Sequence, residues 1–189
     1  EIAGEKLHEK VDLKKLDIIA RHSWGKNEVL DLHSNIDKSV ESINKFAGKD
    51  EASKFREFCD LSENLFNLLE KNYIRKQKPS ILQLTNSMGF LGAKLMWKAG
   101  LLRSLWSSLE KNFSDPRLQQ LFGRYSTYCG SSPWLSPSTL MLIWNVEMQG
   151  VWSINGGIIE LARALTKIAK KNGVKFHKGF CEEILTYDK

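Results

Sequence analysis

The sequence has little cysteine and little proline: three cysteines and four prolines in 189 residues. The cysteines, Cys59, Cys129 and Cys181, lie far apart, and none belongs to a CxxC or Cys/His pattern. That spacing argues against a zinc site, and an odd number of separated thiols is typical of reduced cysteines in a cytoplasmic protein. We therefore expect no metal site and no disulfide framework.

Several motifs of catalysis and cofactor binding are also absent from the sequence. It contains no GxGxxG, no P-loop, no HExxH and no GxSxG, so it assigns no catalytic residue. No secretory signal opens the chain, and its first residue is not Met, so we expect a piece of a longer polypeptide. The uncharged run 79–93 has 15 residues, fewer than the ~20 that a helix needs to span a bilayer.

Acidic residues are nearly absent from one window of this basic chain. The net charge is +6, and the window 71–111 holds eight basic residues against the single acid Glu110. Leucines follow one stripe through its second half, flanked by Trp97 and Trp106. Such a segment suits peripheral docking on a membrane, while an ordinary helix pair with a solvated basic face is the alternative. Because no common nucleic-acid reader motif is present, we expect no nucleic-acid partner.

The pattern of apolar residues predicts a mainly helical α+β protein. A hairpin is expected around the Gly-Lys-Asn turn at 25–27, followed by helices over 37–46 and 50–73. Asp115-Pro116 and Ser136-Pro137 each predict a helix start. A strand is expected at 151–154, then an amphipathic helix ending at Asn172-Gly173, and a further strand over 174–184.

Three polar residues that could suggest chemistry have a simpler interpretation. His22 lies beside Trp24, a pairing more typical of packing or of the surface than of catalysis. Arg124 and Glu147 are the charged residues nearest the aromatic stretch, and a structural ion pair or surface placement is favoured over proton transfer.

The stretch GRYSTYCGSSPWLSPSTLMLIWNVEMQGVWSINGGIIELARAL resembles the central part of the phytoene desaturase family of carotenoid desaturases. Within that family it is most similar to the 1-hydroxycarotenoid 3,4-desaturases, also called methoxyneurosporene dehydrogenases. The likeness continues upstream through FSDPRLQQLF and ARHSWGKNEVLDL, and downstream to CEEI, so it covers nearly the whole chain.

The resemblance implies an FAD-dependent enzyme with a glutathione-reductase-like FAD-binding fold and an inserted, helix-rich substrate domain. It assigns residues 1–153 to the substrate domain and 154–189 to a returning, incomplete limb of the FAD domain. It implies cofactor contacts at Gly156, Gly157 and the backbone of Cys181. Cys181 stands where the family usually has Val. The N-terminal GxGxxG of the family is missing here, so we expect the chain alone to be inactive.

The implied substrate is a long acyclic carotenoid, with C-3,4 desaturation of a 1-hydroxy- or 1-methoxycarotenoid favoured. Trp144, Trp152 and Tyr128 are the expected substrate contacts, with Tyr125 and Trp134 also considered, although aromatic residues at helical spacing more often belong to a core. The implied location is the cytoplasmic side of the photosynthetic inner membrane, contacted through residues 71–111. The alternatives are a phytoene- or neurosporene-type desaturase and a non-catalytic lipid-binding module.

Overall fold

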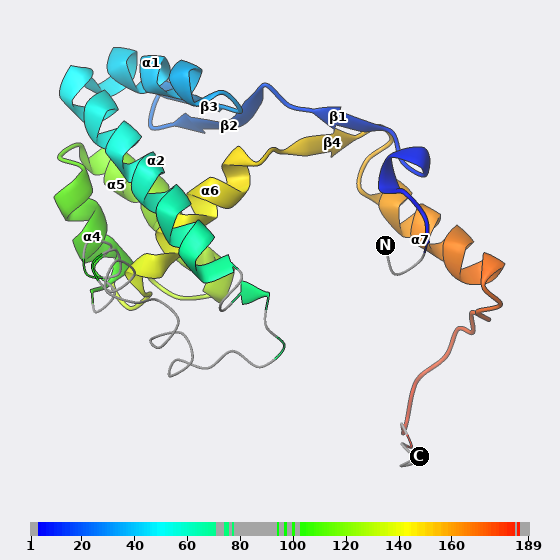
Figure 1. The fold of residues 1–189 in the computed structure, drawn as a ribbon. Helices are drawn as coiled ribbons and strands as arrows, with labels where there is room; N and C mark the ends of the chain where they lie inside the picture. Colours follow the sequence, from blue (N-terminus) through cyan, green and yellow to red (C-terminus); the bar gives the residue numbers. More distant parts are fainter. Residues whose placement is uncertain are drawn as a thin grey trace. The chain divides into compact units, whose positions relative to one another are not determined.

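The computed structural model describes residues 4–70, 74, 75, 77, 94, 97, 100, 103–183 and 185. It divides into two compact units, one of residues 16–151 and one formed by 1–15 together with 152–189. We call them the helical unit and the two-segment unit (Figure 1). The expected division into a substrate domain (1–153) and part of an FAD domain (154–189) is a division by ligand, and it stays a prediction.

The helical unit begins with the expected hairpin. Strand β2 (Ile18–Ser23) pairs antiparallel with β3 (Val29–His33), and Leu30 and Leu32 of β3 are buried. Helix α1 (Ile36–Ala47) follows at once. Its N-cap is Asn35, whose side chain accepts from the amides of Asp37 and Lys38. The hairpin and the first helix are therefore confirmed.

Helix α2 (Lys49–Leu69) is the longest element of the described chain and supplies much of its core. The predicted buried face is confirmed, since all five of its predicted residues are buried: Ala52, Phe55, Phe58, Leu65 and Leu69. Glu51 is also buried, and its carboxylate accepts from the backbone amides of Ser114 and Asp115 and from Lys54 Nζ. This carboxylate ties the start of α2 to the turn before α5.

Further helices follow in the described part of the helical unit after residue 103. Helix α4 (Leu105–Asn112) leads to α5 (Pro116–Gly123), which begins as predicted with Asp115 as N-cap and Pro116 in the first turn. A 3-10 helix, η3 (Arg124–Cys129), extends α5 to Gly130, where φ is 61°. The Ser136-Pro137 start yields a second 3-10 helix, η4 (Ser138–Met141), continued by α6 (Leu142–Met148).

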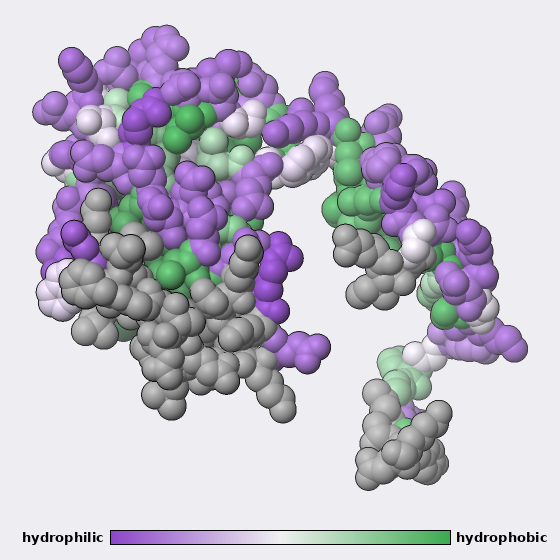
Figure 2. Space-filling model, viewed as in Figure 1, coloured by the Kyte–Doolittle hydropathy of each residue, from purple (hydrophilic) through white to green (hydrophobic). Residues whose placement is uncertain are grey.

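The core of the helical unit is rich in aromatic rings. Phe122 contacts Phe55, Phe58, Phe113 and Trp144, with ring centroids 4.7–5.9 Å apart. Such pairs contribute about 0.5–1.5 kcal/mol each beyond the area that they bury. The outer face seen in Figure 2 is mostly hydrophilic, with hydrophobic residues visible in the gaps.

The two-segment unit is built on a strand pair that the sequence did not indicate. Strand β1 (Leu13–Lys15) pairs antiparallel with β4 (Trp152–Ile154), with Leu13 opposite Ile154 and Lys15 opposite Trp152. The short 3-10 helix η1 (Leu7–Glu9) precedes β1, and α7 (Ile159–Lys171) follows β4. The predicted strand, Gly-Gly turn and amphipathic helix are thus confirmed.

Two expectations fail in the described residues. The predicted strand over 174–184 is wrong for residues 174–183, which form no strand and are exposed. A strand needs a hydrogen-bonded neighbour, and no described strand pairs with this segment. The leucine stripe of the basic window is also altered, because Leu105 and Leu109 are fully buried in the core. Most of the window 71–102 lies outside the described residues.

Candidate functional site

The Gly-Gly turn between β4 and α7 has the backbone geometry of a close-approach site. Gly156 and Gly157 have φ values of 85° and 87°, which residues with a Cβ rarely adopt. Beside Gly157 there is open space, with no atom within 4 Å of the position that a Cβ would take. Helix α7 starts directly after the turn without a side-chain cap. The turn therefore requires glycine on conformational grounds and leaves room for a ligand at Gly157.

A hollow of about 560 Å³ adjoins this turn. It is lined by Asp12, Leu13, Lys14, Ser153, Ile154, Asn155 and Gly156. The Asn155 side chain donates to Asp12 Oδ2 at 3.2 Å, and its backbone amide donates to the Asp12 carbonyl at 3.0 Å. Glu160 lies in the first turn of α7 and is paired with Arg163. The hollow itself carries one acid, Asp12, and one base, Lys14, and the charge of Glu160 is paired with Arg163, so its charges favour no ion of either sign.

The three predicted substrate contacts lie in different environments. Trp152, on β4 of the two-segment unit, is 47% exposed, and Lys15 Nζ lies 5.6 Å from the centre of its ring. Tyr128, on η3 of the helical unit, is 65% exposed. Trp144 is 1% exposed. Both Trp152 and Tyr128 have surface available for a ligand, whereas Trp144 has none.

Trp144 instead packs in the core, which was the alternative interpretation of this residue. Its ring packs edge-on against Phe55 and Phe122, and its Nε1 donates to Cys59 Sγ at 2.9 Å. Burial raises the pKa of the Cys59 thiol to about 12, which keeps the sulfur protonated and unreactive. We therefore correct the expectation of substrate contact at Trp144.

The predicted ion pair between Arg124 and Glu147 is confirmed. Arg124 Nη2 lies 2.9 and 2.8 Å from the two carboxylate oxygens, and the Tyr125 hydroxyl donates to the same carboxylate at 3.0 Å. Tyr125 is fully buried, so it belongs to the core as well. The pair joins η3 to α6.

His22 lies within electrostatic range of this ion pair. Burial lowers the pKa of His22, the Arg124 charge lowers it further, and Glu147 acts in the opposite direction. Its Nε2 is buried and has no hydrogen-bond partner within the described part of the chain. A neutral imidazole beside Trp24, with ring centroids 6.1 Å apart, fits the predicted packing role.

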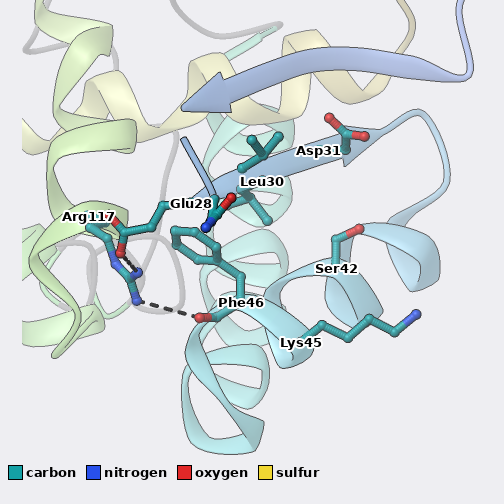
Figure 3. A pocket seen from close by; sticks show the side chains of 9 residues that line it. Glu28, Leu30, Asp31, Ser42, Lys45, Phe46 and Arg117 are labelled. Atoms are coloured by element: carbon teal, nitrogen blue, oxygen red, sulfur yellow. Dashed lines mark hydrogen bonds and ion pairs between the residues drawn. The ribbon is translucent and has the colours of Figure 1, made fainter. Parts of the chain in front are cut away.

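A hollow of about 360 Å³ lies beside the hairpin, and Figure 3 shows Arg117 at its edge joined to Glu28 and to the Phe46 carbonyl. Arg117 Nη1 contacts Glu28 Oε1 at 2.7 Å, and its guanidinium lies 4.1 Å from the centre of the Phe46 ring. Arg117 also pairs with Asp115. Its charge is thus satisfied within the protein, which makes this corner structural.

A groove on the helical unit combines residues that the sequence did not connect. Trp106 of α4 and Trp134 of the loop after η3 have ring centroids 4.7 Å apart. They border a depression of about 660 Å³ that Pro116, Gly123 and Pro133 also line. Trp134 was considered as a substrate contact, but no local pattern placed it against Trp106.

The remaining expected features lie apart from these sites. Cys181 is exposed in the irregular segment after α7, and its predicted backbone contact with FAD stays a prediction. In the described ranges, no group of three or more His, Cys, Asp or Glu residues is arranged to hold a metal ion. None of the helices that the structure describes has the length and hydropathy needed to cross a membrane.

The fold and these sites define a mixed helix-and-sheet chain with an aromatic helical unit and a glycine turn ahead of an amphipathic helix. No family model matches the chain. It is 42% identical to the hydroxyneurosporene desaturase of Rubrivivax gelatinosus over 188 residues, which is 98% of this chain and 36% of that protein. The corresponding enzyme of Cereibacter sphaeroides is 39% identical over 180 residues, 95% of this chain and 36% of that protein.

A more distant relative extends the same pattern. The 4,4'-diaponeurosporene oxygenase of Staphylococcus aureus is 26% identical over 191 residues, covering 100% of this chain and 38% of that protein. Along nearly its whole length the chain is therefore similar to carotenoid desaturases, as its sequence predicted. It spans about a third of the length of these relatives.

Proposed function

We propose that this chain forms part of an FAD-dependent desaturase that dehydrogenates a long acyclic carotenoid, favouring C-3,4 desaturation of a 1-hydroxy- or 1-methoxycarotenoid. The observation that carries the proposal is the 42% identity to a hydroxyneurosporene desaturase along 98% of the chain. The higher identity to the desaturases than to the diaponeurosporene oxygenase supports dehydrogenation over oxygenation. A phytoene- or neurosporene-type desaturase of the same family is the second candidate.

The FAD, when bound, supplies an acceptor for the hydride that leaves the substrate. The residues of this chain that fit the group are Gly156 and Gly157, where positive φ and the space beside Gly157 allow backbone to approach a flat ring. The pyrophosphate of FAD is proposed to bind the N-terminal GxGxxG of the family, which this sequence lacks. The exposed ring of Trp152, two residues before Ile154, is suited to hold an apolar chain near this turn.

The proposed setting is the cytoplasmic face of the photosynthetic membrane, because a substrate as apolar as a lipid tail has to enter from a bilayer. The basic window 71–111 is the proposed contact, by attraction between its cations and anionic lipids. Of that window, α4 is excluded as an apolar docking face, since Leu105 and Leu109 point into the core.

The test is expression of the full-length protein that contains this chain in cells that accumulate 1-hydroxyneurosporene. We expect a yellow flavoprotein and a carotenoid product with a longer conjugated system, seen as a red shift in its absorption. An unchanged carotenoid pool together with a flavin-free protein would overturn the proposal. Conversion of neurosporene or phytoene alone would favour the second candidate.

The place of the flavin is tested by one substitution with a matched control. Gly157→Ala adds a methyl group in the open space at the turn, whereas Gly173→Ala does so at the end of α7, where φ is 83° and the space is equally open. Both variants strain the backbone by about 1 kcal/mol. We expect only Gly157→Ala to lose flavin on purification, measured by absorbance against protein. Equal retention in the two variants would contradict a flavin contact at this turn.

A further inference from the structure

The groove between Trp106 and Trp134 has largely apolar walls, and hydrogen bonds hold these walls in place. The Trp106 amide donates to the Pro133 carbonyl at 2.9 Å, which fixes the loop against α4. The Trp106 side chain is oriented by its Nε1, which donates to Glu110 at 2.8 Å. A Cβ at Gly123 would make ordinary contact with the Trp106 ring at 3.6 Å, so the backbone of α5 lies directly beside this ring. The groove is therefore built before any ligand arrives.

The charged residues at the edge of the groove are already neutralised. Arg124 is paired with Glu147, and Arg117 with Asp115 and Glu28. Gln120 accepts from Trp24 Nε1 at 2.6 Å. No residue from Tyr125 to Val146 carries a charge. Both arginines thus have a carboxylate partner, and Arg124 Nε, which has no hydrogen-bond partner in the described residues, is itself buried. A charged ligand would therefore find no accessible unpaired charge on these residues, whereas an uncharged apolar ligand needs none.

The Trp134 ring leaves part of its surface open to solvent in this groove. It is 59% exposed and tilted by 34° against the Trp106 ring. Exposed tryptophan beside proline rings offers flat apolar area at little cost in conformational entropy. At about 660 Å³, the depression falls within the range of small-molecule sites, 300–1,000 Å³.

We propose that the Trp106–Trp134 groove binds one segment of a long, uncharged, conjugated hydrocarbon chain, stacked against the Trp134 ring. The inference rests on the proposed function and adds to it a substrate subsite on the helical unit. The flat indoles suit a planar polyene better than a bent saturated chain. The neutralised rim favours a hydrocarbon over a lipid headgroup.

The test titrates the full 189-residue chain with the methyl ester of cis-parinaric acid, an uncharged conjugated tetraene. Its own emission reports binding, so loss of a tryptophan does not remove the signal. We expect saturable binding that Trp134→Ala weakens about tenfold, through lost apolar contact area. Trp134→Phe should recover part of the affinity.

The matched control is Leu135→Ala, which removes a side chain that is 83% exposed, next in sequence and outside the groove. We expect this variant to bind like the unmodified chain. The proposal would be overturned if both variants weakened tetraene binding equally, or if Trp134→Ala had no effect on it. It would also be overturned if methyl stearate, a saturated ester, displaced the tetraene as well as an unlabelled polyene does. Since Trp134 is exposed, both variants should keep the circular dichroism spectrum and unfolding midpoint of the parent.

Failure of this subsite and failure of the proposed function give different results. If the chain binds the tetraene through Trp134 but the full-length protein converts no carotenoid, the subsite stands and the function fails. If the full-length Trp134→Ala enzyme desaturates its carotenoid with unchanged KM and kcat, the function stands and the groove is not a substrate subsite.

Discussion

At the scale of single residues, Glu51 is the charged group most deeply built into the helical unit. It is 6% exposed, and it holds three donors from two segments: Lys54 on its own helix and the backbone amides of Ser114 and Asp115. Burial raises the pKa of this carboxyl, but the hydrogen bonds from Lys54, Ser114 and Asp115 outweigh burial and leave the pKa below its ordinary value.

A pKa depressed in the folded state means that the carboxylate stabilises the fold at neutral pH and loses that effect as pH falls through the folded-state pKa. We expect Glu51→Gln to lower the free energy of unfolding by about 1–3 kcal/mol at pH 7. The difference from the parent should shrink as pH falls below the ordinary carboxyl range. Urea unfolding at several pH values measures this.

A control for that experiment is Glu41→Gln, which removes the carboxylate of an exposed pair with Lys45 on α1. Exposed pairs of this kind contribute little, so this variant should follow the parent at each pH. A Glu51→Gln deficit that is the same at low and neutral pH would assign the effect to packing instead of charge.

At the scale of elements, the leucines of α4 have two interpretations, a membrane-facing stripe and a part of the core. A membrane-facing stripe predicts that Leu109→Ala weakens binding to vesicles and leaves stability unchanged. The structure buries Leu109 completely, so we expect this substitution to lower the free energy of unfolding by about 2–5 kcal/mol. Leu135→Ala, at an exposed position of the same unit, should change it by less than about 0.5 kcal/mol. Urea unfolding measures the stability of both variants. Equal stability of Leu109→Ala and Leu135→Ala would contradict the assignment of Leu109 to the core.

Elements with strong local signals were predictable from the sequence. Asp115-Pro116 fixes the start of α5 because a capping carboxylate and a ring-locked φ both favour that position. The spacing of Phe55 and Phe58 identifies the buried face of α2. The strand expected from Val174 and Phe176 failed, because a strand exists only with a partner and β propensity alone does not supply one.

The sites were less predictable than the elements, since they depend on contacts between distant residues. Positive φ at Gly156 and Gly157 follows from a strand that turns at once into a helix. Trp144 contacts Cys59 and Phe122, and Trp106 contacts Trp134. These residues are far apart in the sequence, and their spacing does not predict that they meet. Tyr125 and Tyr128 of η3 likewise look equivalent in the sequence, but Tyr125 is buried and Tyr128 is exposed.

At the scale of the whole molecule, the two units differ in how much core they have. In the described residues, the two-segment unit buries Val11 and Ala164, and the helical unit holds the aromatic cluster. Ile158, just before α7, and Leu165 of α7 are 74% and 57% exposed, and Figure 2 shows hydrophobic surface on this unit among hydrophilic residues. The two-segment unit therefore has the lower local stability.

Limited trypsin digestion should cut between Arg163 and Lys178 before it cuts within 38–56 on α1 and α2. The first segment is exposed, and its end forms no regular structure, whereas the second is packed against the core. Mass spectrometry of the early fragments measures the order. Cleavage at Lys38, Lys45 or Arg56 first would contradict the assignment of the stable core.

Strands β1 and β4, which pair with each other, directly precede and follow the helical unit in the sequence. Leu16 donates its amide to the Val151 carbonyl at 2.9 Å, so the helical unit begins and ends at neighbouring points. A unit whose two ends lie close together can be replaced by another through only two crossovers in the gene. The rest of the protein then keeps its own β1–β4 strand pairing. The helical unit can thus be exchanged as one segment, with junctions at Leu16 and Val151, while the β1–β4 pairing passes unchanged from one descendant to the next.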